Sequence, residues 1–419
     1  MHSNVKQAWE VLWAKFYHPD THQLYDYEIV DPAQFPTYEE VTLCIPYANA
    51  PRPVNDPTLV GSWVLAACLQ GYDATGEAAY ADRARRLFIG LTRLARLART
   101  PGYIPRGSVP GHDTVYPNSS VDQYTGFCYA MWRYWSSAVA TSEEKAEAVT
   151  LVCNAATLIS RYHHNIPCDD LLPSYLGDIG NSDDPFRGCR LLHLYKTAFI
   201  MSGDARWEDL YRAKMEEGRR RRLATLFGPD TYPWSGPCCS WAMWQNQAAL
   251  RVLYETETDA ELRRVYRASL DGAGWLVLPW FANWREAFAG KERRIIPDLW
   301  RAYWPHFERA YPDHDRRRTT FPLHPEVFRD FIREHEGRIP IPEVMLARAT
   351  VAKGELRAAL QYLAVALFAE DPDLHREAAR EGLPMLTGGD MTQPECCGEL
   401  RNLGNAYWRG VEVGVFPAP

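Results

Sequence analysis

Two aspartates stand at the beginning of two apolar segments of the sequence. Asp56 precedes Pro57 in VNDPTLVGSW, and Asp122, 66 residues further on, heads DQYTGFCYAMW. Proline is common in the first turn of a helix, so Asp56 and Asp122 are both expected at helix starts. A pair of carboxylates can share acid–base work, because one donates a proton while its partner accepts one or stabilises positive charge. Asp56 and Asp122 are therefore the candidate catalytic residues.

The loop before Asp122 carries further side chains that could take part in chemistry. It runs from 102 to 120, GYIPRGSVPGHDTVYPNSS, and loops of this length are usually functional or disordered. Arginine can bind a carboxylate, and histidine and tyrosine can donate hydrogen bonds or transfer protons. The candidate substrate-binding residues are Arg106, His112, Asp113 and Tyr116 in this loop, together with Gln123, Tyr124, Trp63 and Glu395.

An aspartate at a helix N-terminus also has a purely structural explanation. Free backbone N–H groups and the helix dipole favour a carboxylate there, so each of these acids can be a cap. Asp183 and Asp184 precede a third apolar segment in the same way. The sequence leaves capping and catalysis open for all of them.

A recurring pattern predicts the elements that position these residues: an almost wholly apolar segment, a short polar turn and an amphipathic segment. An apolar helix of this kind is buried on all sides, whereas an amphipathic one faces solvent along one side. Thr141, Asp204 and Asp259 are expected N-caps of amphipathic helices, and Glu144 completes a capping box with Thr141. The predicted pairs are 58–70 with 77–97, 123–138 with 144–162, 187–201 with 205–216, 239–254 with 260–275, and 356–368 with 373–381.

Repeated pairs of this kind are accommodated by a closed ring with an inner barrel of apolar helices and an outer wall of amphipathic ones. The predicted fold is an all-α (α/α)6 toroid in a single domain, 1–419, with seven hairpins as the alternative. The sixth hairpin is expected within 276–350, together with an irregular excursion, and helices at 4–17 and 399–408 add to the ring or close it. The N-termini of the inner helices gather at one mouth of such a ring, so Asp56 and Asp122 should converge there.

Composition narrows the function classes. The net charge is −7 and the basic clusters, Arg219–Arg222 and Arg316–Arg318, are short and isolated, which argues against nucleic-acid binding. No stretch approaches the roughly 20 apolar residues that span a bilayer, and the N-terminus lacks the apolar core of a signal peptide, so we expect a cytoplasmic protein without a membrane partner. The aromatic content of 13% suits a groove that stacks against sugar faces, although such rings also fill space between helices.

The ten cysteines are expected to be reduced, mostly buried thiols. The adjacent pairs Cys238-Cys239 and Cys396-Cys397 raise the question of a metal site. Their spacing does not match the C-x2-C or H-x3-H patterns of zinc ligands. We therefore expect neither a metal nor a cofactor.

Several of these segments resemble the six-hairpin glycosidase superfamily. They are the Asp-headed NDPTLVGSW and SVDQYTGFCYAMW, the turn sequences YDATGEAAYADRA and MSGDARWEDL, and the intervening Arg-containing loop. The resemblance covers most of 55–275 and is closest in character to unsaturated glucuronyl hydrolases and other enzymes that act on uronic acids. It implies that Asp122 is the general acid/base and Asp56 its partner, with Arg106 and His112 receiving a uronate.

The sequence therefore predicts a glycoside hydrolase that acts on oligosaccharides containing uronic acid. One alternative is a uronate lyase, since the same groups with Tyr and His could abstract a proton beside a uronate carboxyl and cause β-elimination. Another is a sugar epimerase or isomerase of the N-acylglucosamine epimerase type, which relies on facing histidines, whereas His163-His164 are expected at the end of an outer helix. The third alternative is a non-catalytic helical scaffold. The oligomeric state is left open.

Overall fold

The structure is a computed structural model that describes residues 3–29, 35, 54–169, 173–180, 188–226, 240–288, 309, 355–387 and 397–419. Twelve helices lie within these ranges and take up 73% of the described residues. The prediction of a mostly helical protein is confirmed. Within the described part, no helix combines the length and the apolarity that crossing a membrane requires.

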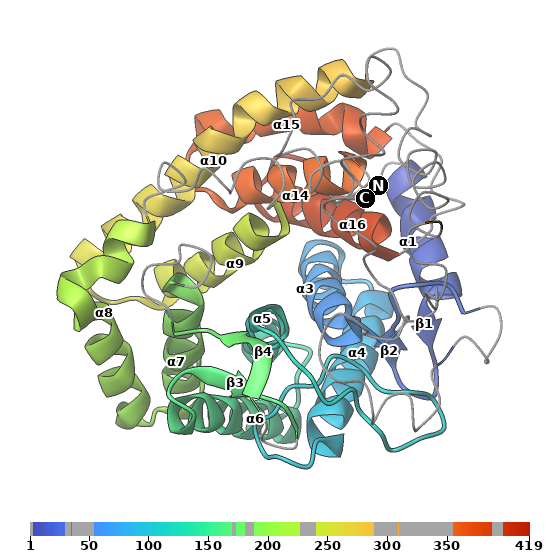
Figure 1. The fold of residues 1–419 in the computed structure, drawn as a ribbon. Helices are drawn as coiled ribbons and strands as arrows, with labels where there is room; N and C mark the ends of the chain where they lie inside the picture. The colour runs from blue at the N-terminus through green and yellow to red at the C-terminus, as the bar shows by residue number, and fades with distance from the viewer. Residues whose placement is uncertain are drawn as a thin grey trace.

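Five helical hairpins follow one another along the chain (Figure 1). They are α3 (Pro57–Thr75) with α4 (Ala78–Leu97), α5 (Val121–Ser136) with α6 (Ser142–Arg161), α7 (Gly188–Ser202) with α8 (Ala205–Leu226), α9 (Ser240–Thr256) with α10 (Ala260–Phe288), and α14 (Glu355–Phe368) with α15 (Pro372–Thr387). These are the five predicted pairs. Helix α10 continues to Phe288, into the stretch that was expected to be irregular, and the rest of that stretch lies largely outside the described residues.

Six helices, which we call the inner helices, contact one another in series. Helix α3 contacts α5, α5 contacts α7, α7 contacts α9, α9 contacts α14, α14 contacts α16 (Cys397–Glu412), and α16 contacts α3 again. The other helices pack behind these, with α4 on α3, α6 on α5 and α7, α8 on α7, α10 on α9 and α14, α15 on α14, and α1 (Ser3–Lys15) on α16. Figure 1 shows the two chain ends close together beside α1 and α16.

The hairpin that the sequence predicted within 276–350 lies largely outside the described residues. It was expected between the fourth and fifth pairs, where α9 contacts α14 in the described part of the chain. The sixth pair that the structure describes is α16 with α1, contributed by the two ends of the chain. Helix α16 is also longer than the predicted 399–408 and ends with an ion pair between Arg409 and Glu412, one turn apart.

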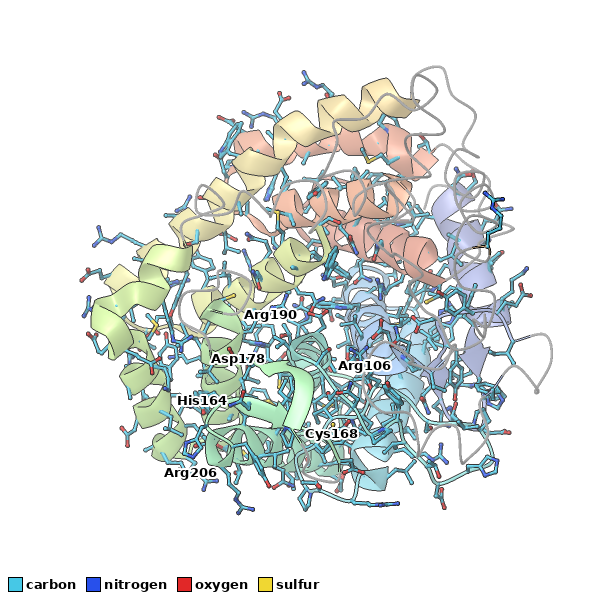
Figure 2. All side chains as sticks on the ribbon, viewed as in Figure 1. Arg106, His164, Cys168, Asp178, Arg190 and Arg206 are labelled. Atoms are coloured by element: carbon cyan, nitrogen blue, oxygen red, sulfur yellow. The ribbon has the colours of Figure 1, made fainter. Side chains whose placement is uncertain are left out.

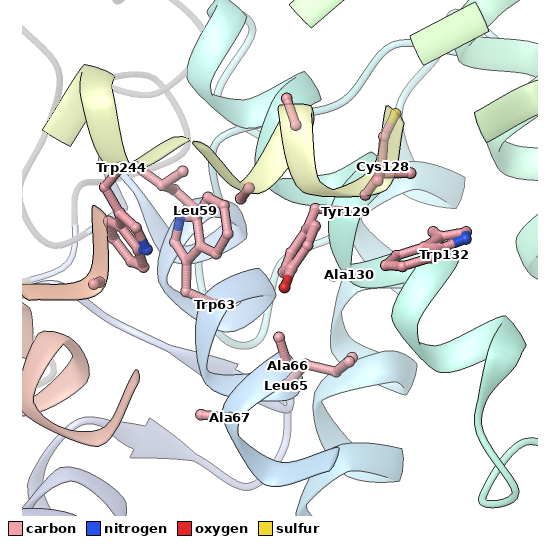
Figure 3. Close-up of a cluster of buried hydrophobic side chains, with 14 of the residues drawn as sticks. Leu59, Trp63, Leu65, Ala66, Ala67, Cys128, Tyr129, Ala130, Trp132 and Trp244 are labelled. Atoms are coloured by element: carbon pink, nitrogen blue, oxygen red, sulfur yellow. The ribbon is translucent and has the colours of Figure 1, made fainter. Parts of the chain in front are cut away.

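Burial distinguishes the two kinds of helix as predicted. Every residue of α3 from Pro57 to Gly71 is buried, whereas α4 buries one face that includes Ala84, Leu87, Leu91 and Leu94. Between the inner helices, aromatic rings pack among leucine, alanine and cysteine side chains (Figure 3). The ring centroid of Trp63 lies 4.4 Å from that of Trp244 and 5.1 Å from that of Tyr129, so α3, α9 and α5 meet through aromatic rings that are tilted against one another.

The caps of the amphipathic helices follow the predicted chemistry. Thr141 and Glu144 form the complete capping box of α6. Asp259 accepts the N–H groups of Glu261 and Leu262 at 2.9 and 3.1 Å. Asp204 accepts the N–H of Arg206 at 3.1 Å. Gly76 ends α3 with φ +69°, a left-handed conformation that favours glycine.

Strands are few and short in the described residues. Strand β1 (Tyr17–His18) pairs antiparallel with β2 (Gln23–Leu24), and β3 (Asn165–Pro167) pairs antiparallel with β4 (Pro173–Asp178). The first hairpin fixes the long loop: Gln23 Nε2 donates to Ser108 Oγ at 2.7 Å and Ser108 N donates to Gln23 Oε1 at 3.1 Å. The loop that carries the candidate residues is therefore attached to this hairpin through Ser108.

Candidate functional site

Asp56 stands at the start of α3, but its carboxylate does not cap the helix. Its Oδ1 accepts hydrogen bonds from Arg106 Nη1 at 2.6 Å and Gln123 Nε2 at 2.7 Å, and its Oδ2 accepts one from Asn55 Nδ2 at 3.2 Å. The backbone N–H of Asp56 donates to Asp26 Oδ2 at 2.7 Å. Capping, one of the two explanations that the sequence left open, does not account for Asp56.

The loop before α5 places Arg106 against Asp56. Thr58 N donates to Arg106 O at 2.8 Å, and Thr58 Oγ1 donates to Pro105 O at 2.5 Å, which fastens the loop to the first turn of α3. Gly107 allows this approach, because a Cβ there would lie 2.7 Å from the ring of Pro57. Arg106 is only 4% exposed, and its guanidinium faces Asp56 and the carbonyl oxygen of Asn55. Arg106 is therefore placed to fix the orientation of the Asp56 carboxylate.

Asp122 lies in the first turn of α5 and forms an ion pair with Arg190 of α7. Asp122 Oδ1 accepts Arg190 Nη1 at 2.5 Å, while Arg190 Nε donates to Asn246 Oδ1 at 2.8 Å and Nη2 to Ala242 O at 3.4 Å. Arg190 therefore joins the starts of α5, α7 and α9. Among the described residues, Oδ2 of Asp122 has no hydrogen-bond partner.

The two aspartates are connected through the first turn of α5. Gln123 follows Asp122 in the same helical turn and donates its amide to Asp56, so it connects the starts of α3 and α5. The side chains of Asp56 and Asp122 are 28% and 31% exposed, whereas those of Arg106 and Arg190 are 4% and 3% exposed. Figure 2 labels both arginines. We call this group the carboxylate cluster: Asp26, Asp56, Arg106, Asp122, Gln123 and Arg190.

Four of the predicted site residues are thus brought together, and three others belong to the core. Tyr124 is buried and donates its hydroxyl to Gly102 O at 2.9 Å, and burial raises the pKa of this phenol. Tyr116 is fully buried, and its backbone N–H donates to Gly107 O. Trp63 is 1% exposed and packs against the rings of Tyr129 and Trp244. These rings support the helices that carry the carboxylates.

The remaining predicted residues lie on the surface or cannot be placed. His112 and Asp113 are exposed at the tip of the loop, and Asp113 faces Arg93 at 3.6 Å with 85% of its side chain exposed. Neither forms a hydrogen bond or an ion pair with the carboxylate cluster within the described residues. Glu395, Asp183 and Asp184 lie outside the described residues.

The sequence analysis missed Asp26, Arg190, Asn246 and His193. Arg190 could have been found, because it stands in the first turn of an apolar segment just as Asp122 does. His193 lies one turn further along α7, is completely buried, and has no hydrogen-bond partner in the described part of the chain. Burial and the charge of Arg190 lower the pKa of His193 to about 3, so it is neutral at physiological pH. No sequence feature of this kind marks Asp26.

Metal binding finds no support in the described residues, which contain no group of three or more His, Cys, Asp or Glu side chains close enough to hold an ion. Cys68 and Cys128 are buried, and burial raises the pKa of both thiols. Such thiols behave as small hydrophobic side chains. Cys238, Cys239 and Cys396 lie outside the described residues.

Comparison with known proteins adds no identification: the sequence matches neither a protein-family model nor a curated protein.

Proposed function

We propose that this chain is a glycoside hydrolase on an (α/α)6 toroid and that it acts on oligosaccharides containing uronic acid. The toroid is supported by the closed series of contacts among the six inner helices and by the second helix that packs behind each of them. The N-terminal ends of α3, α5, α7 and α9 supply Asp56, Asp122, Arg190 and Asn246. One end of the inner helices therefore collects the polar groups.

The observation that carries the proposal is the pair Asp56 and Asp122, linked through Gln123 and each about one-third exposed. Cleavage of a glycosidic bond needs one carboxyl group to protonate the leaving oxygen and a second to activate water or to stabilise positive charge. Two acids that are anchored at the starts of the adjacent helices α3 and α5 and remain partly exposed are the candidates for these groups. Both acids receive charge-assisted hydrogen bonds, which fix their orientation.

The hydrogen bonds suggest how the two acids divide the work. Asp56 uses both carboxylate oxygens to accept from Arg106, Gln123 and Asn55, so its orientation is fixed. Asp122 accepts from Arg190 through Oδ1 alone, and its Oδ2 has no partner among the described residues. We assign Asp122 as the general acid/base, because a proton must be able to enter and leave its carboxyl group. Asp56 is the fixed partner that activates water or stabilises positive charge.

The uronic-acid part of the proposal is supported by the resemblance of 55–275 to uronic-acid-acting hydrolases. It is not supported by Arg106, whose guanidinium is directed to Asp56. β-Elimination is less well supported than hydrolysis, because Tyr116 and Tyr124 are buried and His112 lies exposed at the loop tip. These tyrosines would have been the bases of a lyase.

A panel of substrates tests the proposal. The purified full chain is incubated with saturated and unsaturated uronyl disaccharides and with matched neutral disaccharides, and both new reducing ends and ultraviolet absorbance are recorded. We expect new reducing ends from uronyl substrates without the absorbance of a new 4,5-double bond, and no product with Asp122→Asn. A gain in that absorbance would show a lyase, equal rates on neutral substrates would remove the uronic-acid preference, and no cleavage of any substrate would contradict the hydrolase.

A further inference from the structure

One large aromatic side chain is exposed on an inner helix. Among the described residues, three other large hydrophobic side chains are exposed, and Ile89, Trp275 and Leu383 all lie on helices that pack behind the inner ones. Trp241 lies in the first turn of α9 and is 38% exposed, although Ser240 and the four residues after Trp241 are buried. Single exposed rings on outer helices are ordinary, so the position of Trp241 sets it apart.

The first turn of α9 is held beside the carboxylate cluster. Arg190 of that cluster donates through Nη2 to the carbonyl oxygen of Ala242, the residue after Trp241, at 3.4 Å. On the other side of Trp241, Ser240 Oγ donates to Gln361 Oε1 of α14 at 2.7 Å. Trp241 therefore lies at the end of the inner helices where the polar groups collect.

Helix geometry gives the direction in which Trp241 points. Residues three or seven positions apart lie on nearly the same face of an α-helix. Trp241 precedes Trp244 by three positions on α9, and Asp122 precedes Tyr129 by seven on α5. Trp244 and Tyr129 both pack against Trp63, and these three rings line one small pocket between the inner helices (Figure 3). Trp241 and Asp122 therefore lie on the faces of α9 and α5 that are directed to the same interior space, each at the exposed start of its helix.

We propose that Trp241 is a sugar-binding residue: one pyranose ring of the substrate stacks on its indole while Asp122 acts on the adjoining glycosidic bond. This inference rests on the proposed glycoside hydrolase. The flat apolar face of an indole contacts the C–H groups of a sugar and carries no charge, so it binds uronyl and neutral rings alike. Such a contact is made in the ground state and the transition state, and it therefore acts on KM rather than on kcat.

Protection from chemical labelling tests the contact in the wild-type full chain. A short pulse of 2-hydroxy-5-nitrobenzyl bromide alkylates accessible indoles, and mass spectrometry of peptides gives the labelling rate of each tryptophan. The probes are the saturated and unsaturated uronyl disaccharides and the matched neutral ones. We expect a disaccharide at ten times its dissociation constant to slow the labelling of Trp241 about tenfold. Trp275, which is 44% exposed on α10, is the internal control and should be labelled at an unchanged rate.

Variants test the same contact by kinetics. Trp241→Leu removes the ring, and we expect KM to rise about tenfold on every disaccharide that the chain cleaves, with kcat little changed. Trp241→Phe keeps a flat ring and should recover most of the affinity. Trp275→Leu is the matched control, because it removes an exposed tryptophan from a helix behind the inner ones, and its KM should equal that of wild type.

The outcomes separate this inference from the proposed hydrolase. Equal labelling of Trp241 with and without every disaccharide overturns the inference, whether or not the chain cleaves sugars. Cleavage with a normal KM in Trp241→Leu also overturns it and leaves the hydrolase standing. A disaccharide that protects Trp241 without being cleaved supports the sugar-binding residue and contradicts the hydrolase. A rise in KM confined to uronyl substrates would contradict stacking, because an indole face does not select for charge.

Discussion

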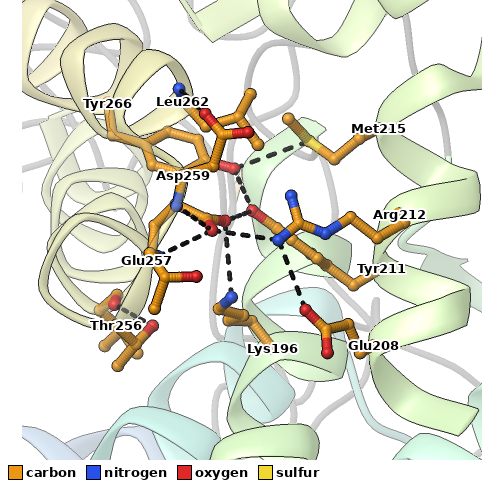
Figure 4. Close-up of polar contacts among 12 residues, drawn as sticks. Lys196, Glu208, Tyr211, Arg212, Met215, Thr256, Glu257, Asp259, Leu262 and Tyr266 are labelled. Atoms are coloured by element: carbon orange, nitrogen blue, oxygen red, sulfur yellow. Dashed lines mark hydrogen bonds and ion pairs between the residues drawn. The ribbon is translucent and has the colours of Figure 1, made fainter. Parts of the chain in front are cut away.

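Two polar clusters at opposite ends of α9 contain the same kinds of group and differ in what they leave accessible. The carboxylate cluster lies at the start of α9, where Ala242 and Asn246 contact Arg190. The second cluster follows the end of the same helix, and we call it the Glu257 cluster: Glu257, Lys196, Tyr211, Arg212 and Tyr266 (Figure 4). In both of them, side chains from several helices converge on a carboxylate.

Glu257 is completely enclosed. Its Oε2 accepts from Tyr211 Oη at 2.5 Å and lies 3.5 Å from Lys196 Nζ, and its Oε1 accepts from Arg212 Nη2 at 3.2 Å and from the N–H groups of Thr258 and Asp259. Its side chain is 0% exposed. Burial opposes ionisation, but the hydrogen bonds and the two cations lower the pKa of Glu257.

The two clusters differ in how much of their acidic side chains is exposed to solvent. Asp56 and Asp122 are 28% and 31% exposed, so a substrate can reach them, whereas nothing can reach Glu257. The hydrogen bonds of Asp122 are also incomplete, while those of Glu257 use both oxygens. We therefore place the proposed acid–base chemistry at the carboxylate cluster and propose a structural role for the Glu257 cluster.

The largest effect expected is on turnover at the carboxylate cluster. Asp122→Asn keeps the shape of the side chain but removes its proton exchange, and we expect turnover to fall by about 10²–10⁴-fold. Tm should fall less than in a variant of an enclosed acid, because Asp122 is 31% exposed although its partner Arg190 is buried. Steady-state kinetics on the best uronyl substrate and a melting curve measure both. Asp113→Asn is the matched control and should leave turnover unchanged, because Asp113 is 85% exposed. An Asp122→Asn variant with near-normal turnover would exclude this acid from the mechanism.

For Glu257→Gln we expect the converse, a large loss of stability without a loss of turnover. This change leaves Lys196 and Arg212 without the negative charge that they share, and removal of one partner from a buried ion pair costs about 3–5 kcal/mol. Urea unfolding measures the loss, and turnover per folded molecule should stay the same. If turnover falls as it does in Asp122→Asn while stability is kept, the division of labour between the two clusters is wrong.

Much of the fold could be predicted because the helices depend on local patterns of apolar and polar residues. The alternation of apolar and amphipathic segments gave five hairpins, and Thr141 with Glu144 marked a helix start that the structure confirms. The helices at the two ends of the chain were predicted only as elements that add to the ring or close it. That α1 pairs with α16 could not be predicted, because a contact between segments so far apart leaves no periodic trace.

The site could be predicted only as far as helix starts. Asp56 and Asp122 were found because each stands at the head of an apolar segment. Successive residues of a helix point about 100° apart, so Asp122, Gln123 and Tyr124 cannot share one face. Gln123 reaches Asp56, whereas Tyr124 turns to the carbonyl of Gly102. Arg106 was assigned to a uronate because the sequence does not show that Asp56 lies within its reach.

The next largest effect expected is a loss of stability at low pH, caused by a histidine on the helix that joins the two clusters. Helix α7 carries Arg190 in one cluster and Lys196 in the other, with His193 midway between them. The pKa of His193 is lowered from 6.5 to about 3, so the unfolded chain binds a proton that the folded chain does not, and stability is lost as pH falls from 6.5 towards 3.

We therefore expect His193→Gln to reduce the loss of unfolding free energy between pH 7 and pH 5 by about 2 kcal/mol relative to wild type. Urea unfolding at the two pH values measures it. The pKa of His164 is also lowered, so His164 contributes to the pH dependence of stability as well. Its contribution is the same in wild type and variant and therefore cancels when the two are compared. An identical pH dependence in the variant would show that His193 is not neutral in the folded chain.

The smallest effect separates two roles for Arg106. Lysine keeps the charge but not the planar guanidinium, which contacts Asp56 and Asn55 at the same time. If Arg106 positions Asp56, Arg106→Lys should lower kcat by about tenfold on every substrate that the chain cleaves, with KM little changed. If Arg106 instead binds a uronate, KM should rise for uronyl substrates and stay constant for neutral ones. The second pattern would restore the role that the sequence suggested and would leave Asp56 held by Gln123 and Asn55 alone.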